Sequence, residues 1–275
     1  MEAATTPAWL VIQPWFKDHH FNGITMLPAV EALEFLAQQV HARFPGLQYR
    51  QMATASFPRF LELMPGQPTI EVWVTCAPLT EGTLKAALQT KKQLKAMTRL
   101  ISHCEVLFGM EPMATVPCPP SPHPPVMEIE ADRLYRDLVP FGPMYRSLRG
   151  QIQLESTCAR GLLEPPLLPG VDRPRFLLGS PFAMDGAMHL ACVHGQRLVD
   201  FIPFPVGFTH RSVHAPTHAT TRYEARAHLQ RHTAQELVYD LEIVDHGQVQ
   251  ETIQGLRMRD ISGGRLKPAA WIRRR

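Results

Sequence analysis

The sequence predicts an α+β fold made of two similar units side by side, and three observations lead to this prediction. Two apolar segments with the spacing of buried helices lie far apart in the chain. Segments with the alternating pattern of strands accompany each of them, and a proline-rich stretch lies between the two groups. Because neither group holds a second helix of comparable length, we expect each sheet to wrap around a single helix.

Composition favours a globular protein without a membrane segment. Of the 275 residues, 45% are apolar, which is enough for a substantial core. No run reaches the roughly 18 apolar residues of a spanning helix, and the N-terminus lacks the charged-then-apolar order of a signal peptide. The 5 cysteines are scattered without CxxC spacing, which fits neither a disulfide framework nor a zinc site. We therefore expect a cytoplasmic protein with reduced thiols.

The net charge of +3 is small, and its most obvious cluster is the C-terminal tail with Arg265, Lys267 and residues 273–275. Such a tail is either a solvated chain end or a docking point for an acidic partner. We expect neither a nucleic-acid partner nor binding to a membrane.

The first unit is predicted to occupy residues 1–111. Pro28 stands where a helix can begin, and apolar residues then recur at helical spacing, which predicts a buried helix over residues 29–44. The alternation of residues 69–77 and 99–109 predicts two strands, each with one apolar face.

A linker over residues 112–127 separates the units, because its seven prolines exclude a helix and remove hydrogen-bond donors from any strand. The second unit, residues 128–275, repeats the plan of the first. In chain order it shows a strand, an apolar helix and two strands joined by an Asp-His-Gly turn, at residues 149–155, 180–195, 236–244 and 248–260.

A histidine, a glycine and a proline precede the first helix. His19 lies four residues before Gly23, which lies five residues before Pro28. A glycine lets the backbone approach a ligand closely, and the helix start beyond it presents unpaired N–H groups that can hold a carbonyl oxygen. His19 beside that spot would act as a general base on the carbon next to the carbonyl. The competing interpretation is a histidine that only caps or packs against the helix.

An aspartate interrupts the apolar sequence of the second helix. Asp185 is followed four residues later by His189, on the same helical face. Because burial raises the pKa of a carboxyl group, Asp185 would stay protonated near neutral pH and act as a general acid, while His19 would stay neutral. If Asp185 instead caps the first turn of the helix, its pKa would be lowered.

A turn punctuated by proline and glycine opens the second unit at residues 138–146. Its centre is the sequence Phe141-Gly142-Pro143, and Tyr145 follows shortly after. Taken alone, this segment is an ordinary loop.

In their order and separations, these three segments resemble the dehydratase domains of polyketide synthases. Members of that family carry a HxxxGxxxxP motif in the first half, a YGPxF-like turn that opens the second half, and DxxxQ or DxxxH on the second central helix. The first motif is matched in full by His19, Gly23 and Pro28, and the last by Asp185 and His189.

The chain departs from the family pattern at three positions. Phe141 stands where tyrosine is usual and Tyr145 where phenylalanine is usual. Position 141 therefore lacks the hydroxyl group with which the family's tyrosine could form a hydrogen bond. Ala29 stands where a glycine commonly follows the proline. Residues 102–109 and 240–260 also look like the closing strands of the family, so the resemblance extends over nearly the whole chain.

The resemblance implies a double hot-dog fold, in which two antiparallel sheets each wrap around a central helix. It also implies a dehydratase that acts on β-hydroxyacyl thioesters: His19 would take the α-proton, Asp185 would protonate the departing hydroxyl, and an enoyl thioester would form. Neither a metal nor a redox cofactor is expected. The substrate would be bound by Gly23, Pro28, Phe141, Gly142, Pro143, Tyr145 and His189.

In such enzymes the substrate hangs on the phosphopantetheine arm of an acyl carrier protein. An acyl carrier protein is therefore the expected partner, in polyketide or fatty-acid-like biosynthesis, and the sequence is also compatible with a homodimer. Since the chain begins just before the first unit and ends shortly after the second, we expect a free-standing dehydratase.

Three alternatives stay open at this point. A cyclase or double-bond isomerase of the same fold also needs enolisation next to a carbonyl, and a module that binds acyl chains without turnover would explain the missing tyrosine. A metal site is the third alternative, because His210, His214 and His218 recur at a spacing of four.

Overall fold

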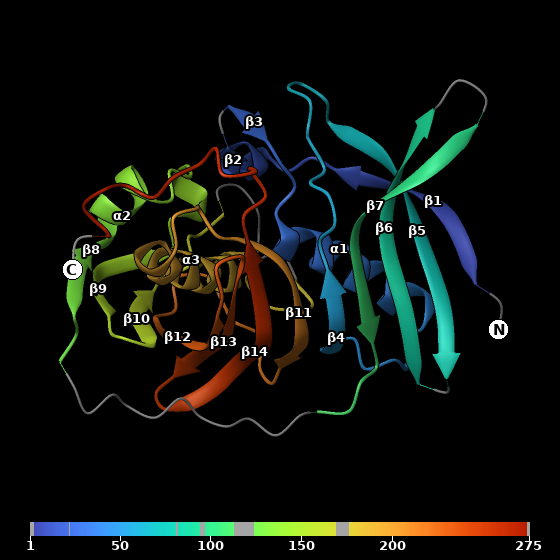
Figure 1. Ribbon diagram of the computed structural model, residues 1–275. Helices are drawn as coiled ribbons and strands as arrows, with labels where there is room; N and C mark the ends of the chain where they lie inside the picture. Colours follow the sequence, from blue (N-terminus) through green and yellow to red (C-terminus); the bar gives the residue numbers. More distant parts are fainter. Residues whose placement is uncertain are drawn as a thin grey trace.

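The computed structural model describes residues 3–21, 23–80, 82–93, 97–112, 124–168 and 176–273. Its main feature is a 12-stranded antiparallel sheet with the strand order β1-β5-β6-β7-β4-β11-β14-β13-β12-β10-β9-β8. The sheet curls around two helices, α1 in the first half of the chain and α3 in the second (Figure 1). No helix within these residues is both long and apolar enough to cross a membrane.

The first half provides one central helix, five strands of the main sheet and a small hairpin. In chain order its elements are β1 (Ala4–Val11), the 3-10 helix η1 (Pro14–Asp18), β2 (His20–Phe21), β3 (Ile24–Thr25), α1 (Ala29–Arg43), β4 (Gln51–Ser56), β5 (Thr69–Thr80), β6 (Thr83–Gln93) and β7 (Thr98–Phe108).

The second half provides the other central helix and seven strands. Its elements are β8 (Met127–Glu130), α2 (Ala131–Asp137), the 3-10 helix η2 (Pro143–Tyr145), β9 (Leu148–Leu154), β10 (Cys158–Leu163), α3 (Pro181–Leu198), β11 (Phe204–Val213), β12 (Tyr223–His232), β13 (Glu236–Asp245) and β14 (Gln248–Arg259).

The expected elements are present where the periodicity placed them. The helix expected over residues 29–44 is α1, the helix expected over residues 180–195 is α3, and the four longer strand predictions correspond to β5, β7, β13 and β14. Val72, Val74 and Cys76 of β5 are buried on the face that alternation predicted. The division into units at residues 111 and 128 stays a prediction, and most of the proline-rich stretch, residues 113–123, lies outside the described residues.

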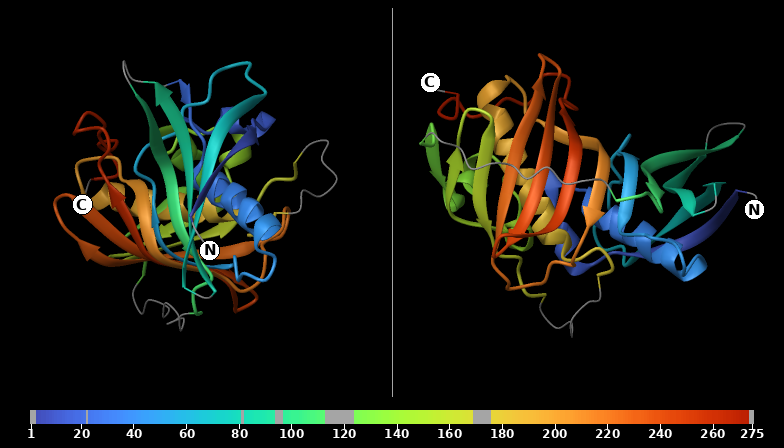
Figure 2. Two further views of the ribbon diagram at one scale, coloured as in Figure 1. Left: turned by 90° about the vertical axis from the view of Figure 1, so that its right-hand side faces the viewer. Right: turned by 90° about the horizontal axis from the view of Figure 1, so that it is seen from below.

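The two halves share one sheet because β4 pairs with β11. In this seam Ser56 lies opposite Gly207 and Ala53 opposite His210. The two additional views show the same arrangement, with the strands of both halves following one another around the enclosed helices (Figure 2). Since α1 and α3 also contact each other, side chains of the two halves meet between the helices.

A buried ion pair lies at this seam. Arg211 of β11 donates through Nε and Nη2 to Oε2 of Glu251 on β14, at 3.0 and 2.7 Å. Both side chains are buried, and the carboxyl group of Glu34 on α1 is close enough to affect the pKa of Glu251. Glu34 itself accepts hydrogen bonds from the backbone N–H groups of Leu177 and Leu178. This polar cluster fixes α1 of the first half against the second half.

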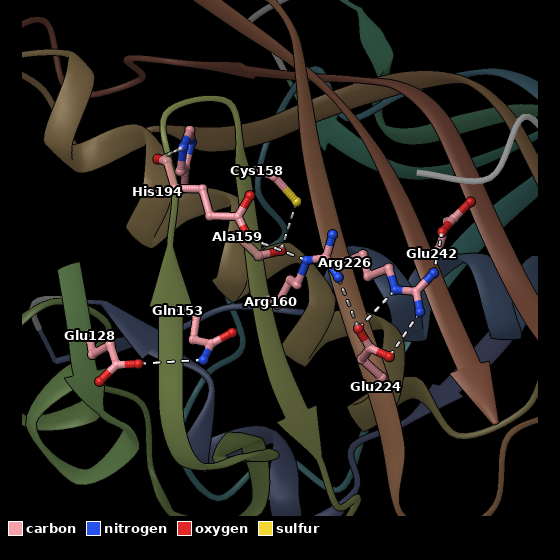
Figure 3. A network of polar contacts seen from close by, with 10 residues as sticks. Glu128, Gln153, Cys158, Ala159, Arg160, His194, Glu224, Arg226 and Glu242 are labelled. Carbon is pink, nitrogen blue, oxygen red and sulfur yellow. Dashed lines mark hydrogen bonds and ion pairs between the residues drawn. The ribbon is translucent and has the colours of Figure 1, made fainter. Parts of the chain in front are cut away.

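In the second half of the chain the outer face of the main sheet is charged, whereas its inner face packs against α3. On β12, buried Ala225 and Ala227 alternate with the outward-facing Glu224 and Arg226. Arg226 pairs with Glu224 at 2.8 Å and with Glu242 of the neighbouring strand β13 at 3.6 Å, as Figure 3 shows. The partly exposed pair with Glu224 contributes little stability, about 0–1 kcal/mol, whereas Glu242 is buried beneath Arg226.

Candidate active site

An apolar cavity lies between the two central helices, with about 980 Å³ of empty space that includes its open mouth. The polar side chains on its wall are few, and among them are His19 from the first half and Asp185 and His189 from α3. The rest of the wall is largely hydrophobic, with Phe21, Met26, Phe57, Phe60, Phe141, Met188, Ile202 and Phe204. Such a wall with a few convergent polar groups is typical of a site for a small, mostly apolar ligand.

His19 directly follows η1, and its ring is held in one orientation. Its Nδ1 lies 3.0 Å from the backbone oxygen of Met26. Because a carbonyl oxygen can only accept a hydrogen bond, Nδ1 carries the proton and Nε2 keeps a free lone pair. The side chain is partly buried and lines the cavity. This is the tautomer that a general base needs.

Aromatic rings of the second half pack against His19. The ring centroid of Phe141 lies 4.4 Å from that of His19, and the edge of Tyr145 faces it at 5.1 Å. Phe141 also lies 5.1 Å from the ring of His189, so its ring is shared by the two histidines. Burial lowers the pKa of His19, and the opposing effect of the Asp185 charge only partly offsets this shift. The free base is therefore the stable form near neutral pH.

Asp18 ties the turn of the second half to the histidine. Its backbone oxygen accepts the N–H of Gly142 at 2.7 Å, and its Oδ2 accepts the N–H of Met144 at 2.9 Å. A Cβ atom on Gly142 would lie 2.5 Å from Cγ of Asp18, so only glycine allows this close approach. The position of His19 thus depends on a contact between the two halves.

We expect the substitution Gly142→Ala to disturb this contact. The added methyl group would push Asp18 away and shift His19 beside it, and a displacement of about 1 Å can cost on the order of 10²-fold in rate. Overpacking should also lower the free energy of unfolding by about 1–3 kcal/mol. Steady-state kinetics and urea unfolding measure the two effects.

Gly46 offers the matched control, because it is exposed and a Cβ there meets nothing within 4 Å. Gly46→Ala should leave both rate and stability close to those of the wild type. Equal effects of the two substitutions would show that the Gly142–Asp18 contact has no special role.

Asp185 and His189 form a close pair on α3. Oδ2 of Asp185 lies 2.9 Å from Nε2 of His189, and both side chains are buried. The approach is too oblique for a good hydrogen bond, since among the described residues neither Oδ2 nor the two ring nitrogens has a hydrogen-bond partner. We interpret the contact as mainly electrostatic. Buried polar atoms without partners inside a cavity are suited to bind a polar group of a ligand.

The charge state of Asp185 differs from the sequence-based expectation. Burial does raise its pKa, but the neighbouring His189 and His19 favour the carboxylate more strongly, so the pKa lies below its ordinary value. Asp185 is also not a helix cap, because α3 begins at Pro181, preceded by Ser180. The expectation considered burial of the aspartate alone and did not include the charge of its neighbours.

The other predicted residues lie at different distances from the cavity. Phe141 and His189 line it, whereas Gly142 and Pro143 form the turn behind Phe141, and Tyr145 is fully buried beside His19. Pro28 is the buried N-cap residue of α1, and the first turn of that helix lines the cavity through Ala29.

Gly23 is exposed in the turn between β2 and β3, with φ +77°. Its backbone conformation, rather than close approach to a ligand, explains the glycine. Binding of a substrate by these residues remains a prediction.

Sequence reasoning missed two acidic residues of the site. These residues are Asp18, directly before His19, and Glu31 on the first turn of α1. A signal was present for Glu31, because it and Glu34 are the acidic residues in an otherwise apolar run. Glu31 and Glu34 are both buried in the structure.

The three histidines His210, His214 and His218 do not form a cluster in the structure. His210 lies in β11, whereas His214 and His218 follow that strand and are exposed. Within the ranges that the structure describes, no group of three or more His, Cys, Asp or Glu side chains is arranged to hold a metal ion.

The fold is an α+β double hot-dog, similar to solved dehydratase domains of polyketide synthases (PKS). A trans-AT PKS dehydratase domain from Brevibacillus brevis has a TM-score of 0.76 and 14% sequence identity, over 94% of each chain. The dehydratase domain of a mycocerosic acid synthase-like PKS has a TM-score of 0.72 and 16% identity, over 94% of this chain and 95% of that one. A bifunctional dehydratase-cyclase domain in ambruticin biosynthesis has a TM-score of 0.71 and 20% identity, over 94% and 91%.

The family is shown by sequence. The model of the polyketide synthase dehydratase N-terminal domain matches residues 118–268, which is more than half of the chain. The chain therefore belongs to the polyketide synthase dehydratase family, whose chemistry is in general that of a hydro-lyase. The matched segment includes Asp185 and His189 but not His19. No curated protein matches the chain in sequence.

Proposed function

We propose that this protein removes water from a β-hydroxyacyl thioester and releases the enoyl thioester. The observation that carries the proposal is that His19 and the Asp185–His189 pair, supplied by different halves of the chain, line one apolar cavity. A base and a proton donor on the same cavity are what a β-elimination requires.

His19 acts as the base in this proposal. Its Nε2 takes the α-proton, and the electrons of the broken C–H bond form the new double bond as the bond from Cβ to the hydroxyl oxygen breaks. Glu31 and Ala32 donate their N–H groups to the carbonyl oxygen of Pro28, whereas the N–H groups of Ala29 and Val30 have no acceptor within the helix, and Ala29 lies on the cavity wall. These last two N–H groups would stabilise the negative charge that develops on the thioester carbonyl.

The Asp185–His189 pair supplies the second proton. Asp185 is the acid of the pair, and Nε2 of His189 lies 2.9 Å from its Oδ2. The lowered pKa of Asp185 describes the free enzyme, where its carboxylate attracts the two histidines. When an acyl chain enters and displaces water, the added desolvation favours the neutral acid, so Asp185 takes up a proton from the solvent and then transfers it to the departing hydroxyl, which leaves as water.

The wall of the cavity fits an acyl chain, and its open mouth would admit the long arm that carries it. We propose phosphopantetheine on an acyl carrier protein as that arm, with no metal or redox cofactor. The exposed Arg59 lies at the cavity and offers a cation to a negatively charged ligand.

The deciding experiment uses the purified protein with β-hydroxyacyl thioesters of pantetheine and of a carrier protein, in both hydroxyl configurations and at several chain lengths. Mass spectrometry should show the loss of one water molecule with the wild type and little loss with Asp185→Asn. A product of unchanged mass but altered chromatographic position would identify an isomerase or cyclase instead. Binding without any product, in every substrate tested, would overturn catalysis.

The pH dependence follows from the state of His19. Because burial lowers the pKa of His19 below the ordinary 6.5, its imidazole should be in the basic form near pH 7 and take up a proton only as the pH drops below 6.5. The negative charge of Asp185 raises the pKa of His19, so its removal should lower the midpoint of the His19 titration further. NMR titration of His19 in wild type and Asp185→Asn measures both midpoints without the need for turnover. A midpoint above 6.5 would contradict the proposed environment of the base.

A further inference from the structure

A carboxyl group that the proposed reaction does not use is buried next to the active site. It belongs to Glu31, on the first turn of α1. Its Oε1 accepts a hydrogen bond from the indole Nε1–H of Trp15 at 2.9 Å and a longer one from the hydroxyl of Tyr145 at 3.4 Å. One oxygen atom therefore joins two aromatic side chains from different halves of the protein.

Both aromatic residues are connected to His19. Trp15 belongs to η1, the short helix that ends at Asp18, directly before the histidine. The ring of Tyr145 presses against the imidazole of His19 at 5.1 Å, and it is fully buried. Glu31 thus holds the segment that leads into His19 and the ring that packs against it.

We propose that Glu31 is a positioning residue, whose carboxyl oxygen clamps Trp15 and Tyr145 and so holds the imidazole of His19 against the cavity. The catalytic part of this inference rests on the proposed function, because His19 acts as the base there. The clamp itself is a structural arrangement that can be measured without turnover.

The charge state of Glu31 fits a clamp that works as a neutral acid. Burial raises its pKa to about 8, and the nearby ionisable groups repel a further negative charge. These groups are Glu34 on the same helix and Asp185 on α3, and the hydrogen bonds from Trp15 and Tyr145 offset only part of the shift. A neutral carboxyl group accepts best through its carbonyl oxygen, which explains why both donors converge on one atom.

Ionisation of Glu31 would therefore place an unfavourable charge between the central helices. Its raised pKa in the folded state means that this stabilising contribution is complete at low pH and is lost as the pH rises through about 8. Above that pH the buried charge costs stability, while the hydrogen bonds from Trp15 and Tyr145 become charge-assisted, so the indole signal of Trp15 should report the ionisation. Glu31→Gln keeps an oxygen acceptor but cannot ionise, so this variant should keep its stability at higher pH.

The first test is NMR of the tryptophan indole N–H groups, of which the chain has only 4. Trp15→Phe assigns the signal of Trp15. In the wild type this signal should shift with a midpoint near pH 8, and in Glu31→Gln it should not titrate. Tyr135→Phe removes a different buried hydroxyl near the site and should leave the titration in place. A Trp15 signal that stays constant up to pH 9 in the wild type would overturn the inference.

The second test separates positioning from simple stability. Glu31→Leu removes the acceptor, so we expect the NMR titration of His19 to move and kcat to fall on the order of 10²-fold with little change in KM. Glu31→Gln, which keeps an acceptor, should instead hold kcat within about threefold of the wild type at pH 7. If Glu31→Leu folds and leaves the His19 titration and kcat unchanged, Glu31 has only a packing role.

The two proposals can fail separately. If the wild type converts none of the thioesters but the Trp15 signal titrates and the His19 titration follows the Glu31 variants, the proposed reaction is wrong and the clamp stands. If water is lost and neither NMR signal responds to Glu31, the reaction stands and the clamp is wrong.

Discussion

Replacing His19 with alanine should lower kcat for water loss by about 10²- to 10⁴-fold, the range for removal of a general base. KM should change little, because the largely apolar wall of the cavity stays intact. The variant should remain folded, since the lost side chain is only partly buried and makes one backbone hydrogen bond. Assays that are quenched at fixed times and analysed by mass spectrometry measure the rate of water loss, and circular dichroism checks the fold.

His20 is the matched control for this substitution. It is the next residue, it lies in the β2–β3 hairpin opposite Thr25, and it does not line the cavity. His20→Ala should keep the rate within a few-fold of the wild type. Similar losses in both variants would mean that the segment matters as a structure and that His19 has no special chemical role.

Replacing Arg211 with methionine should lower the free energy of unfolding by about 3–5 kcal/mol, because it leaves the buried carboxyl group of Glu251 without its cation. The neighbouring Glu34 makes this worse, since it already raises the pKa of Glu251. Urea unfolding at pH 7 measures the loss. The loss should be smaller at pH 5, where Glu251 of the variant is more readily protonated.

A double variant separates the buried charge from the seam itself. Arg211→Met combined with Glu251→Leu removes both charges, and such replacements of a buried pair are often neutral or stabilising. The double variant should recover most of the stability that the single variant loses. If it is as unstable as the single variant, the packing of the seam rather than the unpaired carboxylate explains the effect.

The elements that the sequence predicted are those with a strong local pattern. Strand β5 alternates between buried and partly exposed residues, and α1 carries an apolar face through most of its length. Strands β11 and β12 have polar residues such as Arg211 and Glu224 between their apolar ones, so their pattern is weaker. The pairing of β4 with β11 joins residues about 150 positions apart, and no local pattern reports such a contact.

The candidate site shows the same limit. His19 and Asp185 were predictable as site residues because each belongs to a motif with defined spacing. Their electrostatics were not, since the pKa of Asp185 depends on the balance between burial, His189 on the same helix and His19, which only the fold brings near. The roles of Asp18 and Glu31 likewise depend on contacts with Gly142 and Tyr145 in the other half of the chain.

The seam between β4 and β11 makes the two halves dependent on each other for solubility as well as for chemistry. If the halves were produced as separate polypeptides, each would present an unpaired strand edge, β4 or β11, that is ready to pair with another chain. The first polypeptide would carry His19 and the second Asp185, so neither would hold a complete set of reacting groups. When the two polypeptides are mixed, recovery of activity would therefore indicate that β4 and β11 have paired again.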